Sequence, residues 1–158
     1  MTQKQEESPS VIYTVGTSNR SLEEFLRLLQ SYGIKQVLDV RSFPVSRRFP
    51  HFSRENLEKA LSKANVAYFW LGKELGGYRK GGYEAFMESE VFQQGLLKLI
   101  ELARQEISAI MCAERFPWRC HRRFISQKLE ERGFEVRHII EEGRIWIPRR
   151  SPRMKLMF

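Results

Sequence analysis

Short apolar segments of strand character alternate with helical segments along nearly the whole of this 158-residue chain. The strand-like runs are β-branched and aromatic, and between them apolar residues recur three and four positions apart, as on one face of a helix. This alternation is typical of α/β proteins, in which right-handed crossovers join parallel strands. We therefore predict a single α/β domain with a mostly parallel, five-stranded sheet flanked by helices.

The expected strands are short and rich in Val, Ile and aromatic residues, and they cover 11–15, 36–40, 66–71, 107–112 and 135–140. The first helix is expected after Ser21, which begins a Ser-x-x-Glu capping box with Glu24. Further helices are expected after Ser53, over 83–87, from Ser89 to about 105, and over 122–132. Residues expected to end helices with a left-handed backbone conformation are Gly33, Asn65 and Gly133. The glycine-rich stretch 72–82 predicts a loop.

The ends of the chain differ in composition from its centre. Residues 1–10 are polar and are predicted to be disordered, residues 11–147 form the α/β domain, and residues 148–158 form a basic tail. The longest uncharged apolar stretch, 107–113, is far shorter than the ~20 residues that a membrane helix requires. Two cysteines do not make a disulfide framework. We expect a cytoplasmic protein with no membrane partner, and the oligomeric state stays open.

The charge of the chain is strongly positive, with 27 Lys and Arg against 19 Asp and Glu, for a net charge of +8. Most of this excess lies in the tail, where the residues from Gly143 onward include five cations and no acid. Two internal stretches are also basic: 41–54 has four arginines and no acid, and 112–123 has four arginines against one glutamate. Clustered positive charge favours an anionic partner such as a nucleotide or a nucleic acid. A solvated surface with a cationic tail is the alternative.

Polar residues follow the expected strands directly, and ligands of open α/β sheets bind at the carboxyl ends of strands. The predicted anion-binding residues are Ser18, Asn19, Arg41, Arg115 and Arg122. Asp39 is expected to support the site by holding Arg41, because a buried carboxylate needs a partner. The P-loop and dinucleotide-binding glycine patterns are absent from the sequence, which disfavours an ATPase or a dinucleotide enzyme.

The segment from Cys112 to Arg123 contains the highest density of potentially reactive side chains. The candidate catalytic residues here are Glu114, Cys120 and His121, with Glu114 or His121 as proton carrier. Cys120 precedes an expected helix, and a helix N-terminus lowers the pKa of a thiol. Cys112 ends a buried strand, so it is either a small core side chain or a resolving thiol. The spacing of Cys112, Cys120 and His121 is not a standard zinc pattern, and we predict no metal and no cofactor.

Cations and aromatic residues are interleaved in the segment 47–52, Arg-Arg-Phe-Pro-His-Phe. Single-stranded nucleic acid favours such a composition, because bases stack on rings while phosphates pair with arginine. A proline-bounded loop with its phenylalanines in the core explains the segment equally well.

Five motifs occur in order along the chain: Gly-Thr-Ser-Asn-Arg at 16–20, Asp-Val-Arg-Ser-Phe-Pro at 39–44, Leu-Gly-Gly at 75–77, Cys-Ala-Glu at 112–114 and Cys-His-Arg at 120–122. In these motifs the chain resembles the bacterial and archaeal family called domain of unknown function 488, over roughly residues 11–140. The resemblance implies a fold and a set of motifs but no established reaction. Thr17 stands where many members have histidine, so a role for that histidine does not transfer.

A fainter likeness is to rhodanese domains, which also have Asp-x-Arg after one strand and a cysteine after a later one. Cysteine phosphatases need an arginine six positions after the cysteine, and Trp118 stands there after Cys112. Pro117 also removes a backbone donor from the loop that would surround the anion.

Three functional hypotheses remain open from the sequence, and whether the chain is an enzyme is left undecided. The leading one is an enzyme or binding domain for a phosphate-bearing ligand at the carboxyl edge of the sheet. The alternative is a thiol-dependent enzyme, rhodanese-like or redox, that uses Cys120 as nucleophile and Cys112 as resolving thiol. The third is a nonenzymatic nucleic-acid adaptor that uses Arg47, Arg48 and the tail.

Overall fold

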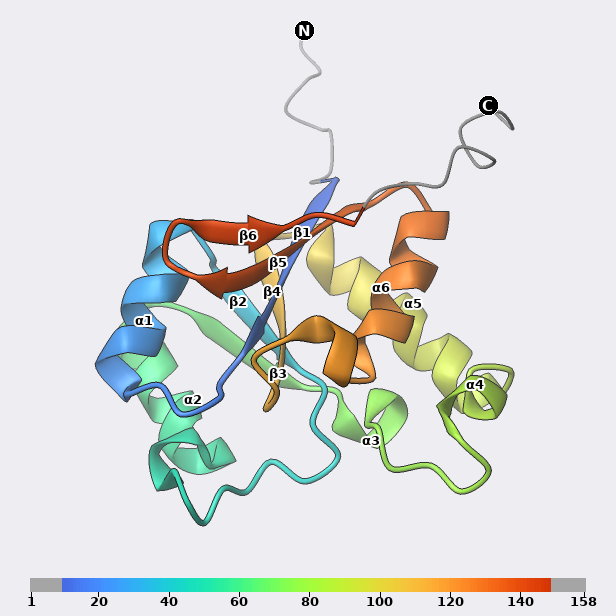
Figure 1. Ribbon diagram of the computed structural model, residues 1–158, viewed down its shortest axis with the longest axis horizontal. Helices are drawn as coiled ribbons and strands as arrows, with labels where there is room; N and C mark the ends of the chain where they lie inside the picture. The colour runs from blue at the N-terminus through green and yellow to red at the C-terminus, as the bar shows by residue number, and fades with distance from the viewer. Residues whose placement is uncertain (1–9, 149–158) are drawn as a thin grey trace, which may run out of the picture.

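A six-stranded sheet forms the centre of the protein (Figure 1), as seen in the computed structural model, which describes residues 10–148. The strands are β1 (Val11–Gly16), β2 (Gln36–Asp39), β3 (Ala67–Trp70), β4 (Ser108–Cys112), β5 (Glu135–Glu141) and β6 (Arg144–Trp146), in the spatial order β3-β2-β4-β1-β5-β6. The first five strands are parallel, and β6 pairs with β5 in the antiparallel direction. The α/β class and the mostly parallel sheet are confirmed.

The sixth strand is the difference from the expected five. The chain turns back after β5 at Glu142 and Gly143, where Gly143 has φ 78°, and Trp146 then pairs with His138. Glycine tolerates this left-handed conformation, which a tight hairpin turn requires. A strand of three residues is too short to show the alternation of apolar and polar residues that identifies a strand, so the sequence pattern did not reveal it.

Helices cover both faces of the sheet (Figure 1). On one face lie α1 (Leu22–Ser31) and α2 (Arg54–Lys63), which follows the 3₁₀ turn η2 (Pro50–Phe52). On the other lie α3 (Gly72–Leu75), α4 (Tyr83–Phe86), α5 (Glu90–Ala103) and α6 (Arg122–Glu131), which follows the 3₁₀ turn η3 (Pro117–Arg119). Each face has its own core: Val37 and Met111 pack with α1 and α2, whereas Leu38 and Ile110 pack with α5 and α6.

The predicted helix ends are largely confirmed. The Ser21 hydroxyl accepts from the backbone N–H of Glu24, and the Glu24 carboxylate accepts from the backbone N–H of Ser21. Asn65 has φ 61°, and Gly33 and Gly133 also have positive φ. Ser53 precedes α2 as expected, but its hydroxyl bonds to the backbone of Ser46 instead of capping the helix.

The stretch 72–82 is not wholly a loop, because its first four residues form the short helix α3. At the start of this helix only a glycine fits, because a Cβ on Gly72 would lie 1.9 Å from the carbonyl oxygen of Arg41. The glycine thus lets the segment after β3 pass directly against the segment after β2. This close approach, invisible in the sequence pattern, brings the exits of two neighbouring strands together at one edge.

Residues 1–9 and 149–158 lie outside the described part of the chain, so the predicted disordered N-terminal segment and the basic tail fall almost entirely there. Within residues 10–148, no helix is both long enough and apolar enough to cross a membrane.

Candidate functional site

Two free cysteines meet at the carboxyl end of β4, in the centre of the sheet. Cys112 is the last residue of β4, and Cys120 lies two residues before α6. The thiol of Cys120 donates a hydrogen bond to the Sγ of Cys112, with 2.7 Å between the sulfurs. Cys112 is buried, and Cys120 is partly exposed. Cys120 is therefore the more exposed of the two thiols.

Arg122, the first residue of α6, is fully buried and turned inward. Its Nε donates to the Sγ of Cys112 at 3.0 Å, and one terminal nitrogen donates to the Thr14 hydroxyl at 2.6 Å. The other terminal nitrogen donates to the carbonyl oxygens of Glu114 and Arg115 at 2.6 and 3.1 Å. Among these acceptors only the sulfur of Cys112 can carry a full negative charge. A buried cation needs a negative charge nearby, so the contact between Arg122 and Cys112 favours the thiolate form of Cys112.

The two thiols have opposite pKa shifts. Burial opposes ionisation of Cys112, but the hydrogen bond from Cys120 and the charge of Arg122 outweigh it and lower the pKa of Cys112 to about 7. The same hydrogen bond, together with burial, raises the pKa of Cys120. Of the two thiols, Cys112 is therefore the one that loses its proton first as the pH rises. From the sequence, the lowered pKa was expected at Cys120; the contacts favour Cys112, because the Arg122 guanidinium donates to that sulfur.

His121 lies beside the thiol pair. One ring nitrogen, Nε2, is 3.0 Å from the carbonyl oxygen of Val40, which can only accept, so this nitrogen carries the proton. The other, Nδ1, is then an acceptor, and it lies 3.6 Å from the Sγ of Cys120. Burial lowers the pKa of His121, which keeps the ring neutral. The ring is held from the other side by Gly77, where a Cβ would lie 2.7 Å from Nδ1.

Asp39 and Arg41 form a buried ion pair at the end of β2. The guanidinium of Arg41 donates to both carboxylate oxygens at 3.0 and 2.9 Å and to the carbonyl oxygen of Phe52 at 2.8 Å. The Tyr68 hydroxyl donates to the same carboxylate. The expected support of Arg41 by Asp39 is present. Because these contacts occupy the guanidinium, Arg41 is held as a structural cation, and the ion pair fixes the loop after β2.

The remaining predicted site residues lie around the exit of β1. Ser18 has φ 50°, and its backbone N–H donates to the carbonyl oxygen of Ala113. Asn19 accepts from Arg115 at 3.2 Å, and Arg115 is partly exposed. The Glu114 side chain is exposed, while its carbonyl oxygen accepts from Arg122. The topology therefore gathers the predicted residues at one edge. Cys112, Arg41 and Arg122 are buried there, whereas Cys120 and Arg115 are partly exposed and Glu114 is exposed.

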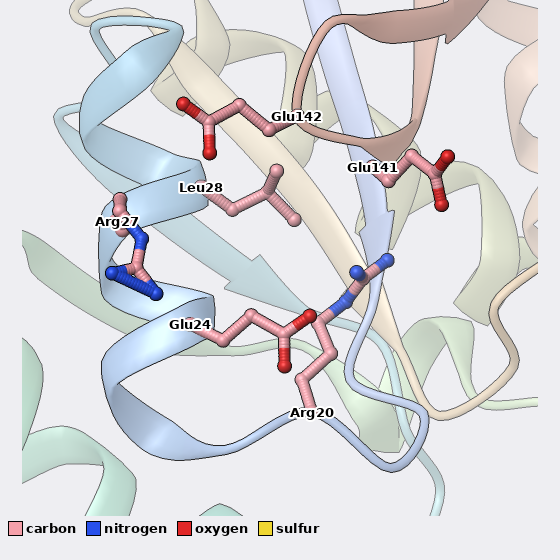
Figure 2. A pocket seen from close by; sticks show the side chains of 6 residues that line it. All are labelled: Arg20, Glu24, Arg27, Leu28, Glu141 and Glu142. Carbon is pink, nitrogen blue, oxygen red and sulfur yellow. The ribbon is translucent and has the colours of Figure 1, made fainter.

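A cavity of about 390 Å³ lies elsewhere, between α1 and the turn that joins β5 to β6 (Figure 2). Its lining is Arg20, Glu24, Arg27, Leu28, Glu141 and Glu142, and it includes none of the predicted site residues. Arg20 is buried and donates to the carbonyl oxygens of Gly16 and Ile140 at 2.9 and 2.7 Å. Burial, with the charge of Arg115, lowers the pKa of Arg20 to about 10. Arg20 therefore joins the ends of β1 and β5, next to the thiol site.

The model of a family described as "Domain of unknown function DUF488" matches residues 21–129, more than half of the chain. The chain belongs to this family. The matched range contains Asp39, Arg41, both cysteines and Arg122, whereas the segment 16–20 precedes it. No curated protein and no solved structure was found to match. The family match leaves the reaction open.

Three buried residues of this site were missed from the sequence: Thr14, Arg20 and His138. The Thr14 hydroxyl lies between Arg122 and the Nδ1 of His138, 2.6 Å from each partner. Burial and the charge of Arg122 lower the pKa of His138 to about 3. The available signal was a hydroxyl in the otherwise apolar strand β1 and an imidazole in the alternating apolar series Val136, His138 and Ile140 of β5, because buried polar groups need partners. Within residues 10–148, no three His, Cys, Asp or Glu side chains are grouped to hold a metal ion.

Proposed function

We propose that the protein is a thiol-dependent redox enzyme in which Cys112 and Cys120 exchange two electrons with a disulfide substrate. The observation that carries the proposal is the contact of Cys112 with both the Cys120 thiol and the Arg122 guanidinium, at 2.7 and 3.0 Å. A thiolate is the attacking species in thiol–disulfide exchange, and a thiol with a pKa near ambient pH attacks fastest. The lowered pKa of Cys112, about 7, fits this requirement.

The reaction proceeds in two exchanges. The side chain of Cys120 first turns aside and opens a path to the buried Cys112. The Cys112 thiolate then attacks one sulfur of the substrate disulfide, which forms a mixed disulfide and releases the first substrate thiolate. The Cys120 thiol then gives its proton to the Nδ1 of His121 and attacks the sulfur of Cys112. This step forms the Cys112–Cys120 disulfide and releases the second substrate thiolate, which takes the proton from His121. The protein is oxidised by two electrons, the substrate is reduced by two, and a dithiol reductant reverses the cycle.

Arg122 has a positioning role in this scheme. Its four hydrogen bonds go to the sulfur of Cys112, the hydroxyl of Thr14 and two loop carbonyls, which ties the loop after β4 to the sheet. When Cys112 gives up its charge to the disulfide, the guanidinium loses its only anionic acceptor. The oxidised form is therefore destabilised relative to a disulfide without a buried cation, and we expect the pair to be readily reduced.

The test is stoichiometric oxidation of the reduced protein by hydroxyethyl disulfide, followed by thiol counting and intact mass. We expect two thiols to disappear per chain, with a mass loss of two hydrogens and no lasting adduct. Cys120→Ser is expected to stop at a mixed disulfide on Cys112, and Cys112→Ser to react much more slowly. A wild-type protein that keeps both thiols, or that accumulates one adduct on Cys120, contradicts the proposal.

A second candidate is binding of a phosphate-bearing ligand at the same edge, in accord with the basic composition. The observation that favours it is the group Arg20, Arg115 and Arg122: the charges of Arg115 and Arg122 both lower the pKa of Arg20. Of these three guanidiniums, only that of Arg115 is partly exposed, and it lies against Asn19. An oxyanion would approach there, since arginine binds phosphate in a bidentate manner.

Calorimetric titration with a nucleotide and inorganic phosphate panel tests the second candidate. Binding that is lost in Arg115→Gln, but kept in the exposed control Arg119→Gln, supports it. No heat from any member of the panel, or equal binding by both variants, contradicts it. The thiol proposal is unaffected by either result, because its cysteines are assayed separately.

A further inference from the structure

Two loops that follow β2 and α3 come together at the carboxyl edge of the sheet. The loop 41–49 follows β2, and the loop 76–82 follows α3. The backbone N–H of Tyr78 donates to the hydroxyl of Ser42 at 3.2 Å, and a Cβ on Gly76 would lie 2.2 Å from that hydroxyl oxygen. The rings of Phe43 and Tyr78 have centroids 5.6 Å apart, with 42° between their planes. The two loops therefore form one continuous surface.

Two aromatic side chains of this surface, those of Phe43 and Tyr78, point away from the core. Tyr78 is 80% exposed and Phe43 is 69% exposed, more than any other large aromatic residue of the described chain. Val45 is also 69% exposed. Neither ring contributes to either hydrophobic core, so their exposure is not explained by packing within residues 10–148.

Both loops are positively charged. The loop 41–49 contains three arginines and no acid, and the loop 76–82 contains Arg79 and Lys80 and no acid. Arg41 is neutralised by Asp39, and Arg79 is held against the backbone and the Phe86 ring. The remaining cations, Arg47, Arg48 and Lys80, are exposed. The guanidinium of Arg48 lies 5.6 Å from the centroid of the Phe49 ring, which keeps a cation close to the aromatic surface.

We propose that this surface, formed by the loops 41–49 and 76–82, binds single-stranded nucleic acid. Unpaired bases stack on exposed aromatic rings, and the phosphates between them pair with flanking cations. A duplex hides its base faces, so it would leave Phe43 and Tyr78 without a partner. An acidic peptide would satisfy the cations but offers no flat faces to the two rings. This function does not depend on the thiol chemistry, although Gly77 of the same loop contacts His121.

The test is fluorescence anisotropy of the full-length protein with a labelled oligonucleotide of unstructured sequence, with the matching duplex and with polyglutamate. We expect the single strand to bind most tightly. The double variant Phe43→Ala/Tyr78→Ala should weaken it at least about tenfold, since each stacked base contributes substantially. Arg47→Gln/Arg48→Gln should weaken binding and reduce the salt slope by about 0.7 for each phosphate that the variant no longer neutralises.

Matched controls separate this surface from general charge and hydrophobicity. Trp146→Ala removes an aromatic ring that is 42% exposed on β6, and Lys98→Gln/Arg104→Gln removes two exposed charges at α5. Both controls should keep wild-type affinity. The proposal is overturned if the single strand does not bind at low salt, or if duplex or polyglutamate binds as tightly. It also fails if the loop variants, shown to be folded by circular dichroism, bind as well as the controls.

Discussion

The Nε of Arg122 lies 3.0 Å from the Sγ of Cys112, in a part of the protein where both side chains are buried. Burying a guanidinium without a counterion is costly, and the other acceptors of Arg122 are a hydroxyl and two backbone carbonyls. The structure therefore couples the charge state of one cysteine to the stability of the loop between β4 and α6. Stability and reactivity should respond together to changes at this pair.

Replacing Arg122 tests whether its buried hydrogen bonds stabilise the folded protein. Arg122→Met leaves the Thr14 hydroxyl and two loop carbonyls without their donor, and we expect a loss of about 3–5 kcal/mol in the free energy of unfolding. Arg122→Lys keeps the charge but not the planar fork, so the loss should be intermediate. Urea denaturation measures both. Arg123→Met, an exposed neighbour in α6, is the control, and an equal loss in it would contradict the account.

The buried ion pair at the end of β2 leads to a second stability prediction. Asp39→Asn leaves the Arg41 guanidinium buried without a counterion, and we expect the free energy of unfolding to fall by about 3–5 kcal/mol. Glu135→Gln removes a carboxylate from the exposed pair with Arg137 and should cost less than about 1 kcal/mol. Thermal and urea unfolding of both variants provide the comparison. Similar losses would mean that Asp39 does not hold the loop.

His138 makes stability depend on pH. Its folded pKa is about 3, whereas an unfolded histidine titrates near ~6.5, so between these values the unfolded chain binds a proton that the folded protein does not. Stability is therefore fully present above about pH 6.5. It should fall as the pH is lowered toward 3, by at most about 1.4 kcal/mol per pH unit.

The measurement for this prediction is urea denaturation between pH 7 and 4, with His138→Gln as the comparison. Glutamine can keep a hydrogen bond to Thr14 but does not titrate, so its slope with pH should be smaller. His121, whose pKa is also lowered, contributes in the same direction and remains in both proteins. An unchanged slope in His138→Gln would remove His138 as the cause.

Local signals in the sequence were sufficient for the sheet and most helices. The Ser21–Glu24 capping box and the left-handed Asn65 are formed as expected, because they depend on neighbouring residues alone. Strand β6 was missed because it is held by pairing with β5. The helix α3 was missed because glycine usually disfavours helices, and Gly72 is there for its close approach to Arg41.

The site was predicted as a set of residues but not as an arrangement. Strand ends converge in parallel sheets, so the sequence could place Cys112, Arg41 and Arg122 at one edge. It could not show which way each guanidinium turns. Arg41 and Arg122 were expected to face a ligand, whereas both are buried and bonded within the protein. The direction of a side chain depends on distant partners such as Thr14, which no local pattern reveals.

The central claim is that Cys112 is the thiolate of the pair, and the most direct measurement is its ultraviolet thiolate absorbance as a function of pH. One thiolate per chain should appear with a midpoint near pH 7. It should disappear in Cys112→Ser and shift to higher pH in Cys120→Ala, which lacks the hydrogen-bond donor. Absorbance that appears only at or above the ordinary thiol pKa of ~8.5, or that survives in Cys112→Ser and is lost in Cys120→Ala, would contradict the account.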